Sequence, residues 1–133
     1  MEQKISLMTL GVHDFSAAVD FYENIFGWER DNSTDENFLL YRLDGFRLAL
    51  YPRDALAEDA SVDPDGKGFK GFTLSYNVGS EQAVDDLIAR FREKGVQIVK
   101  EPQKVFWGGY SGYIADPDGN LWEIAYNPYW EDE

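Results

Sequence analysis

The chain has no cysteine and a single histidine, His13. Without cysteine, disulfide bonds, thiolate metal sites and a cysteine nucleophile are excluded. The chain also lacks any run of about 20 apolar residues, the length that a membrane-crossing helix needs, so we expect no membrane partner. Its first residues, Met1 to Ile5, lack the basic start and apolar stretch of a secretory signal peptide. These absences together favour a cytoplasmic protein.

Positive charge is also scarce. The chain has 12 lysines and arginines against 25 acidic residues, which gives a net charge of −13. Such a surface repels nucleic acid, so we exclude nucleic acid as a partner, whereas a cationic ligand would be attracted. The simpler alternative is that the acidic surface only keeps the protein soluble. Apolar residues are plentiful, at 44% of 133 residues, and predict a single compact domain over residues 1–133.

Hydrophobic periodicity predicts the elements of the first half. Residues 4–12 alternate as a strand with Leu7, Thr9 and Gly11 on one face. A helix follows, capped at its start by Asp14 and ended by Gly27. The next three predicted strands lie near residues 28–33, 38–43 and 46–51, with Asp44-Gly45 as the hairpin turn between the last two. The first unit therefore spans about residues 4–51.

The second half repeats this order. Residues 52–70, rich in Pro, Gly and charged residues, form a predicted connecting segment with one short helical turn around residues 55–60. The second unit spans about residues 71–128 and begins with a strictly alternating strand. Its helix is capped by Ser80 and ended by Gly95. The last three predicted strands are residues 97–104, 109–115 and 121–127, with Asp118-Gly119 as the final turn.

The matched order of elements indicates an α+β fold of two tandem β-α-β-β-β units. Val12 and Val78 precede the two helices, and Gly27 and Gly95 follow them. One helix covers only one face of each sheet, so each unit keeps a bare face. Two such faces side by side predict a curved mixed sheet that cups a small-molecule site.

The two ends of the chain carry motifs of a known family. Leu10-Gly11-Val12-His13-Asp14-Phe15, followed by Phe21-Tyr22-Glu23 and Phe26-Gly27-Trp28, resembles the opening of the vicinal oxygen chelate superfamily. The run from Gly112 to Ile124 resembles its closing signature. This superfamily includes glyoxalase I, the bleomycin resistance proteins and the extradiol dioxygenases, and the resemblance implies the paired-unit fold derived above.

The resemblance also implies where a metal ion would bind. The ligand positions of the superfamily's metalloenzymes fall on Leu7, Ala49, Thr73 and Glu123, and only Glu123 ligates well. One carboxylate does not hold a catalytic metal, which commonly takes three protein ligands. We therefore expect no metal ligands and no cofactor, as in the metal-free members that resemble bleomycin resistance proteins. The resemblance also implies a homodimer.

Alternation selects the side chains that would line the cup. The candidate ligand-binding residues are Thr9, Arg47, Tyr51, Thr73, Ser75, Trp107, Tyr110 and Glu123. Glu123 is also the candidate catalytic residue, as a general base or an acceptor for a cationic ligand. Its structural alternative is a carboxylate paired with Arg47. For the aromatic stretch 105–113, the alternative to a ligand platform is an edge strand or a dimer interface.

Three functions remain open at this point. The first is a metal-independent protein that binds a small cationic or aromatic ligand. The second is a lyase, isomerase or dioxygenase-type enzyme that uses Glu123 as base or metal ligand. The third is an accessory protein whose own aromatic side chains fill the cup.

Overall fold

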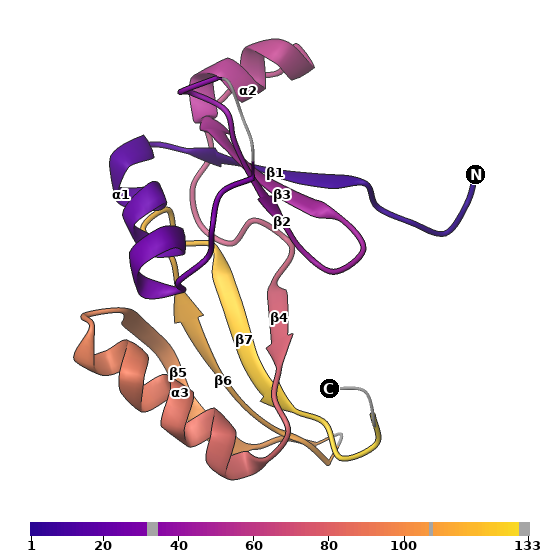
Figure 1. Cartoon of the computed structure of the whole chain (residues 1–133), viewed down its shortest axis with the longest axis vertical. Coiled ribbons are helices and arrows are strands. Elements are labelled where there is room, and N and C mark those ends of the chain that lie inside the picture. Colours follow the sequence, from indigo (N-terminus) through magenta and orange to yellow (C-terminus); the bar gives the residue numbers. More distant parts are fainter. Residues whose placement is uncertain (32–34, 107, 131–133) are drawn as a thin grey trace. The chain divides into compact units, whose positions relative to one another are not determined.

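The computed structural model describes residues 1–31, 35–106 and 108–130. Backbone contacts divide the chain into two compact units, Met1–Lys67 and Gly68–Glu133. Each unit is a mixed sheet with helices packed on it (Figure 1). Throughout these described ranges, no helix has the length and apolar character that crossing a membrane requires.

The sheet of the first unit has three strands. They are β1 (Leu7–Val12), β2 (Leu39–Arg42) and β3 (Arg47–Pro52), in the order β1-β3-β2. Strand β1 runs parallel to β3, and β2 is antiparallel to it. The Asp44-Gly45 turn is confirmed: the Leu43 amide donates to the Phe46 carbonyl over 2.9 Å, and Gly45 has a φ of 85°. A left-handed φ of this kind favours glycine.

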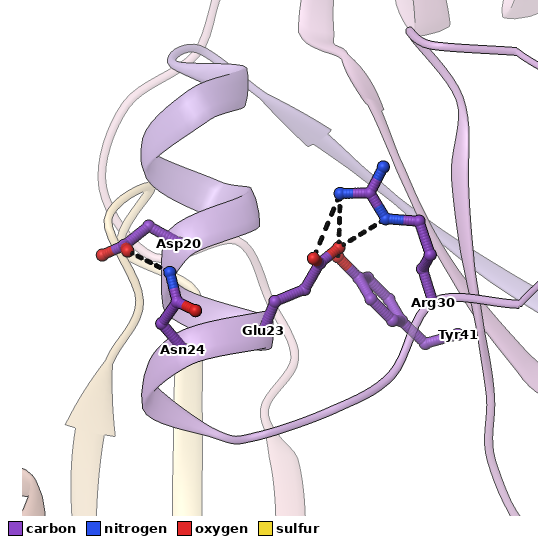
Figure 2. A network of polar contacts seen from close by, with 5 residues as sticks. All are labelled: Asp20, Glu23, Asn24, Arg30 and Tyr41. Atoms are coloured by element: carbon purple, nitrogen blue, oxygen red, sulfur yellow. Dashed lines mark hydrogen bonds and ion pairs between the residues drawn. The ribbon is translucent and has the colours of Figure 1, made fainter.

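The strand predicted near residues 28–33 is wrong for the residues that the structure describes there. Only Arg30 pairs, through an isolated antiparallel bridge to Tyr41. The Asp31 amide donates to the Leu40 carbonyl over 2.7 Å beside this bridge, and side-chain bonds add to it. The Glu23 carboxylate accepts from Arg30 Nε over 3.0 Å and from the Tyr41 hydroxyl over 2.9 Å (Figure 2).

The predicted start of the first helix is confirmed, but the helix changes from α-helical to π-helical hydrogen bonding along its length. Asp14 caps α1 (Phe15–Asp20), and its side chain accepts from the Ala17 amide over 3.0 Å. The helix continues as the π-helix η1 (Phe21–Ile25), in which the Phe26 amide donates to the Phe21 carbonyl. Large rings in and around this segment contact one another, with Phe21, Tyr22 and Tyr41 buried and Phe26 and Trp28 partly exposed.

A second helix in the first unit, α2 (Arg53–Ala60), replaces the short turn that we expected in the connecting segment. It packs on β1 at Gly11, where an added Cβ would lie 3.2 Å from Leu56 Cδ2. Gly11 lies on the face of β1 that alternation assigned to the cup. The bare face predicted for this unit is therefore partly covered by α2.

The second unit matches its prediction more closely. Its elements are β4 (Leu74–Asn77), α3 (Glu81–Glu93), β5 (Gln97–Lys104), β6 (Tyr110–Ala115) and β7 (Leu121–Tyr126). The sheet order is β4-β7-β6-β5, with β4 parallel to β7. The Ser80 hydroxyl accepts from the Ala83 amide over 3.0 Å, which confirms the predicted cap of α3.

One face of the second sheet is buried under α3. Val84, Ile88 and Phe91 of the helix are buried, and so are the core residues of β6 and β7: Ile114, Trp122 and Ile124. Trp122 is thus a core residue, as its alternation with Glu123 predicts. The opposite face carries Ser75, Tyr113 and Glu123.

In both sheets the first strand of the unit lies parallel to the last strand, and the strand that precedes the last lies antiparallel on its other side. The α+β class is confirmed, as two mixed sheets of three and four strands. The second unit has the predicted β-α-β-β-β order, whereas the described residues of the first unit form three of its four predicted strands. The shared cup and the single-domain organisation stay predictions.

Candidate functional site

A polar cluster of four residues lies around Glu123 on the second sheet. Glu123 lies on β7 between its register partners Ser75 on β4 and Tyr113 on β6. The Ser75 hydroxyl donates to Glu123 Oε1 over 2.9 Å. The Tyr113 phenol interacts with the Glu123 carboxylate and with Thr73. We call Thr73, Ser75, Tyr113 and Glu123 the Glu123 cluster.

The cluster's electrostatics favour a protonated phenol beside a carboxylate. Burial raises the pKa of Tyr113 above its ordinary value, and the charge of Glu123 raises it further. Both effects oppose formation of a phenolate. Tyr113 therefore acts as a hydrogen-bond donor near neutral pH, and the Glu123 carboxylate is the acceptor available to a ligand.

A hollow of about 220 Å³ lies near one end of β7, lined by chain neighbours of the cluster and by none of its four members. Phe69, Phe72 and Leu121 give it apolar walls. Leu121 precedes Glu123 by two residues on β7, so both side chains lie on the same face. Lys70 forms one edge, where its Nζ donates to Asn120 Oδ1 over 3.0 Å. An aromatic or aliphatic group thus fits beside the polar cluster.

The three predicted residues of the first unit do not form a comparable cluster. Thr9 pairs with Ala49 and Ala49 with Leu40, so this row lacks a carboxylate where the second unit has Glu123. Arg47 Nε donates to Asp31 Oδ2 over 3.2 Å, which gives Arg47 an ion-pair partner in its own unit. The ring of Tyr51 packs edge-on against Phe38, with centroids 5.3 Å apart.

The two aromatic residues of the stretch 105–113 that we predicted to bind a ligand are Trp107 and Tyr110. Trp107 lies outside the described residues. The Tyr110 hydroxyl donates to Asp85 Oδ1 over 2.7 Å, which directs it toward α3 and away from the Glu123 face.

Sequence reasoning missed Tyr113 as a member of the cluster, although a signal was present. Asp116 accepts from the Asn120 amide in the turn between β6 and β7, so residues 116 and 120 face each other. Counting outward from that pair places Tyr113 opposite Glu123, as the observed register shows.

The residues at the implied metal positions do not fit a metal ion. Leu7 and Ala49 offer only hydrocarbon, and Thr73 offers a neutral hydroxyl. Glu123 already accepts a hydrogen bond from Ser75. In the described part of the chain, no group of three or more His, Asp or Glu side chains is placed to hold a metal ion.

Two mixed sheets, each formed by one half of the chain, define a protein of the α+β class built from two similar units. The profile of the Glyoxalase/Bleomycin resistance protein/Dioxygenase superfamily matches residues 4–124. The chain belongs to this superfamily, as the terminal motifs predict. No match is found among curated protein sequences.

Several solved structures are similar to this chain. A glyoxalase-related enzyme from Fulvimarina pelagi is 35% identical, with a TM-score of 0.87 over 97% of this chain and 91% of that one. A superfamily member from Sphaerobacter thermophilus is 27% identical, with a TM-score of 0.71 over 95% and 98% of the two chains. A lactoylglutathione lyase from Agrobacterium tumefaciens is 23% identical over the full length of both, with a TM-score of 0.75, and shares the fold.

Proposed function

We propose that this protein binds a small molecule on the Glu123 face of its second unit without using a metal ion. The observation that carries the proposal is the Glu123 cluster, in which one carboxylate accepts a hydrogen bond from Ser75 on one neighbouring strand and faces the Tyr113 phenol on the other. A carboxylate that is already positioned in this way costs little further entropy when a ligand binds to it. Its charge favours a cationic or proton-donating group.

The hollow near the cluster supports an apolar or aromatic body for the proposed ligand. Its walls of Phe69, Phe72 and Leu121 favour an apolar or aromatic body. The net charge of −13 favours approach of a cation. The proposed ligand is thus an aromatic or aliphatic molecule with one cationic end, bound by a cytoplasmic homodimer.

The test is a titration with compounds of this class. Benzamidine, tryptamine and bleomycin are added to the protein and binding is followed by calorimetry and thermal shift. We expect saturable binding of at least one compound, weakened about tenfold or more in Glu123→Gln because a charge-assisted bond is lost. Glu93→Gln, which removes an exposed carboxylate of α3, is the matched control. Absence of binding, or equal weakening in both variants, would refute the proposal.

Native mass spectrometry of untagged protein tests the two other parts of the proposal, the homodimer and the metal independence. A dimer without bound metal supports both. A monomer refutes the homodimer, and one divalent ion per chain refutes metal independence.

A second candidate is an enzyme in which Glu123 acts as a general base. It is favoured by the 35% identical relative, which is described as a glyoxalase-related enzyme. In that case Glu123 takes a proton from the substrate while the Tyr113 phenol keeps its own and donates a hydrogen bond. Glu123→Gln should then abolish turnover and leave the thermal midpoint unchanged. Turnover that survives this change would exclude the role.

A further inference from the structure

Two arginines face each other directly across strands of the first unit. Arg42 of β2 and Arg47 of β3 are register partners in the antiparallel ladder. Like charges placed directly opposite each other destabilise a sheet. Sequences that break such a local rule do so most often at functional positions. The pair is therefore a place to look for a ligand.

Asp31 offsets only part of this charge. Its Oδ2 oxygen accepts from Arg47 Nε at 3.2 Å and from Arg42 Nη2 at 3.4 Å. One carboxylate thus faces two guanidinium groups. Each guanidinium carries five N–H donors, and most of those on Arg42 and Arg47 have no partner within the described chain.

A hollow of about 300 Å³ lies beside the arginine pair. Its lining includes three cationic side chains, Lys4, Arg42 and Arg47, and no acidic one. Asp31 and Glu2 neutralise part of this charge from outside the lining. Ile5, Leu43 and Phe46 supply apolar wall between the cations. Such a local excess of positive charge is unusual in a chain whose net charge is −13.

We propose that this hollow binds the oxyanion group of a small molecule, a carboxylate or a phosphate, with its apolar body against Ile5 and Phe46. Arginine is suited to such groups because its planar fork donates two parallel hydrogen bonds. The anion supplies the negative charge that Asp31 alone does not, and so relieves the Arg42–Arg47 repulsion. This site differs from the Glu123 cluster in unit, in residues and in the sign of the charge it accepts.

The experiment is an amide NMR titration of the full chain at low ionic strength, with inorganic phosphate in one arm and benzoate in the other. We expect saturable shifts confined to residues 4–6 and 42–47. Response to phosphate alone identifies a phosphate group as the ligand, and response to benzoate alone identifies a carboxylate with an apolar body. Response to both assigns the site to oxyanions in general. No saturable shift in this region in either arm overturns the proposal.

Three variants separate the site from general charge effects. Arg47→Gln should weaken binding about tenfold, because it removes one charge-assisted donor group. Asp31→Asn should strengthen binding severalfold, since it removes the carboxylate that competes for the same donors. Arg90→Gln removes an exposed charge from α3 and should leave binding unchanged. Equal loss in Arg47→Gln and Arg90→Gln, or weaker binding in Asp31→Asn, would contradict the assignment. Glu123→Gln should have no effect, so failure of the Glu123 proposal leaves this one intact.

Discussion

The Ser75 hydroxyl donates to Glu123 Oε1 over 2.9 Å, and the two residues are register partners on parallel strands. Ser75→Ala removes this donor while the Tyr113 bond to Glu123 stays. We expect the free energy of unfolding to fall by about 0.5–1.5 kcal/mol, measured by urea denaturation. Ser16→Ala, which removes an exposed serine hydroxyl from α1, is the control. An unchanged Ser75→Ala midpoint would show that the bond contributes nothing to stability.

The raised pKa of Tyr113 is measurable by ultraviolet titration. Subtracting the Tyr113→Phe curve from that of the wild type isolates this phenol, and its midpoint should lie above the ordinary value of 10.0. Adding Glu123→Gln should lower the midpoint, because the neighbouring charge is removed. Tyr129→Phe provides a comparison at an exposed ring. If the Tyr113 titration midpoint is the same with and without Glu123→Gln, the interaction between Tyr113 and Glu123 is refuted.

Alkaline stability should depend on Tyr41. Burial raises the pKa of Tyr41 above its ordinary value of 10.0, and its hydrogen bond to Glu23 raises it further. A group whose pKa is higher in the folded state stabilises fully below its unfolded pKa, and this stabilisation is lost as pH rises through the folded pKa. The free energy of unfolding should therefore decline above pH 10. In Tyr41→Phe this decline should be shallower, as followed by urea denaturation at several pH values. A decline of the same slope in both proteins would contradict this assignment.

The two helix caps should contribute independently. Asp14 accepts from the Ala17 amide and Ser80 from the Ala83 amide, in different units. Asp14→Ala and Ser80→Ala should each lower the free energy of unfolding by about 1 kcal/mol. The double variant should lose the sum, because the two caps share no partners. A double variant that departs from the sum would reveal coupling between the caps.

Gly112 is required by close packing of the backbone. A Cβ at Gly112 would lie 2.9 Å from the Lys100 carbonyl oxygen and 3.0 Å from the Pro102 nitrogen. Both atoms belong to the backbone of β5, so neither moves without disturbing the sheet. Gly112→Ala should destabilise by about 1–3 kcal/mol in thermal or urea unfolding. Gly79→Ala, where an added Cβ meets nothing within 4 Å, should be tolerated. Equal effects of both substitutions would refute the packing argument.

The sequence was sufficient where neighbouring residues decide the structure. The caps at Asp14 and Ser80 and the turns at Gly45 and Gly119 follow from short-range hydrogen bonds and backbone freedom. Strand β5 has the predicted bounds, Gln97–Lys104. The sequence also selected Thr73, Ser75 and Glu123, because alternation places them on one face.

The sequence was insufficient to predict secondary structure where an element depends on contacts with distant parts of the chain. Residues 28–33 have the composition of a strand, but only Arg30 bridges to β2, and Glu23 holds that bridge by side-chain bonds. Residues 55–60 were predicted as one short helical turn, and the structure has a longer helix there, Arg53–Ala60, whose Leu56 packs on Gly11. Periodicity indicated the helical turn, but the packing of this helix on β1 was visible only in the tertiary structure.

Composition and periodicity are properties of consecutive residues, so the sequence by itself determined the α+β class, the elements of the second unit and the shortage of residues that ligate a metal. Strand register is a property of residues far apart in the chain. It was therefore only the tertiary structure that placed Tyr113 opposite Glu123 and Arg42 opposite Arg47. Both candidate sites depend on these cross-strand pairs, because the contact distance of opposed side chains is set by the pairing of the strands.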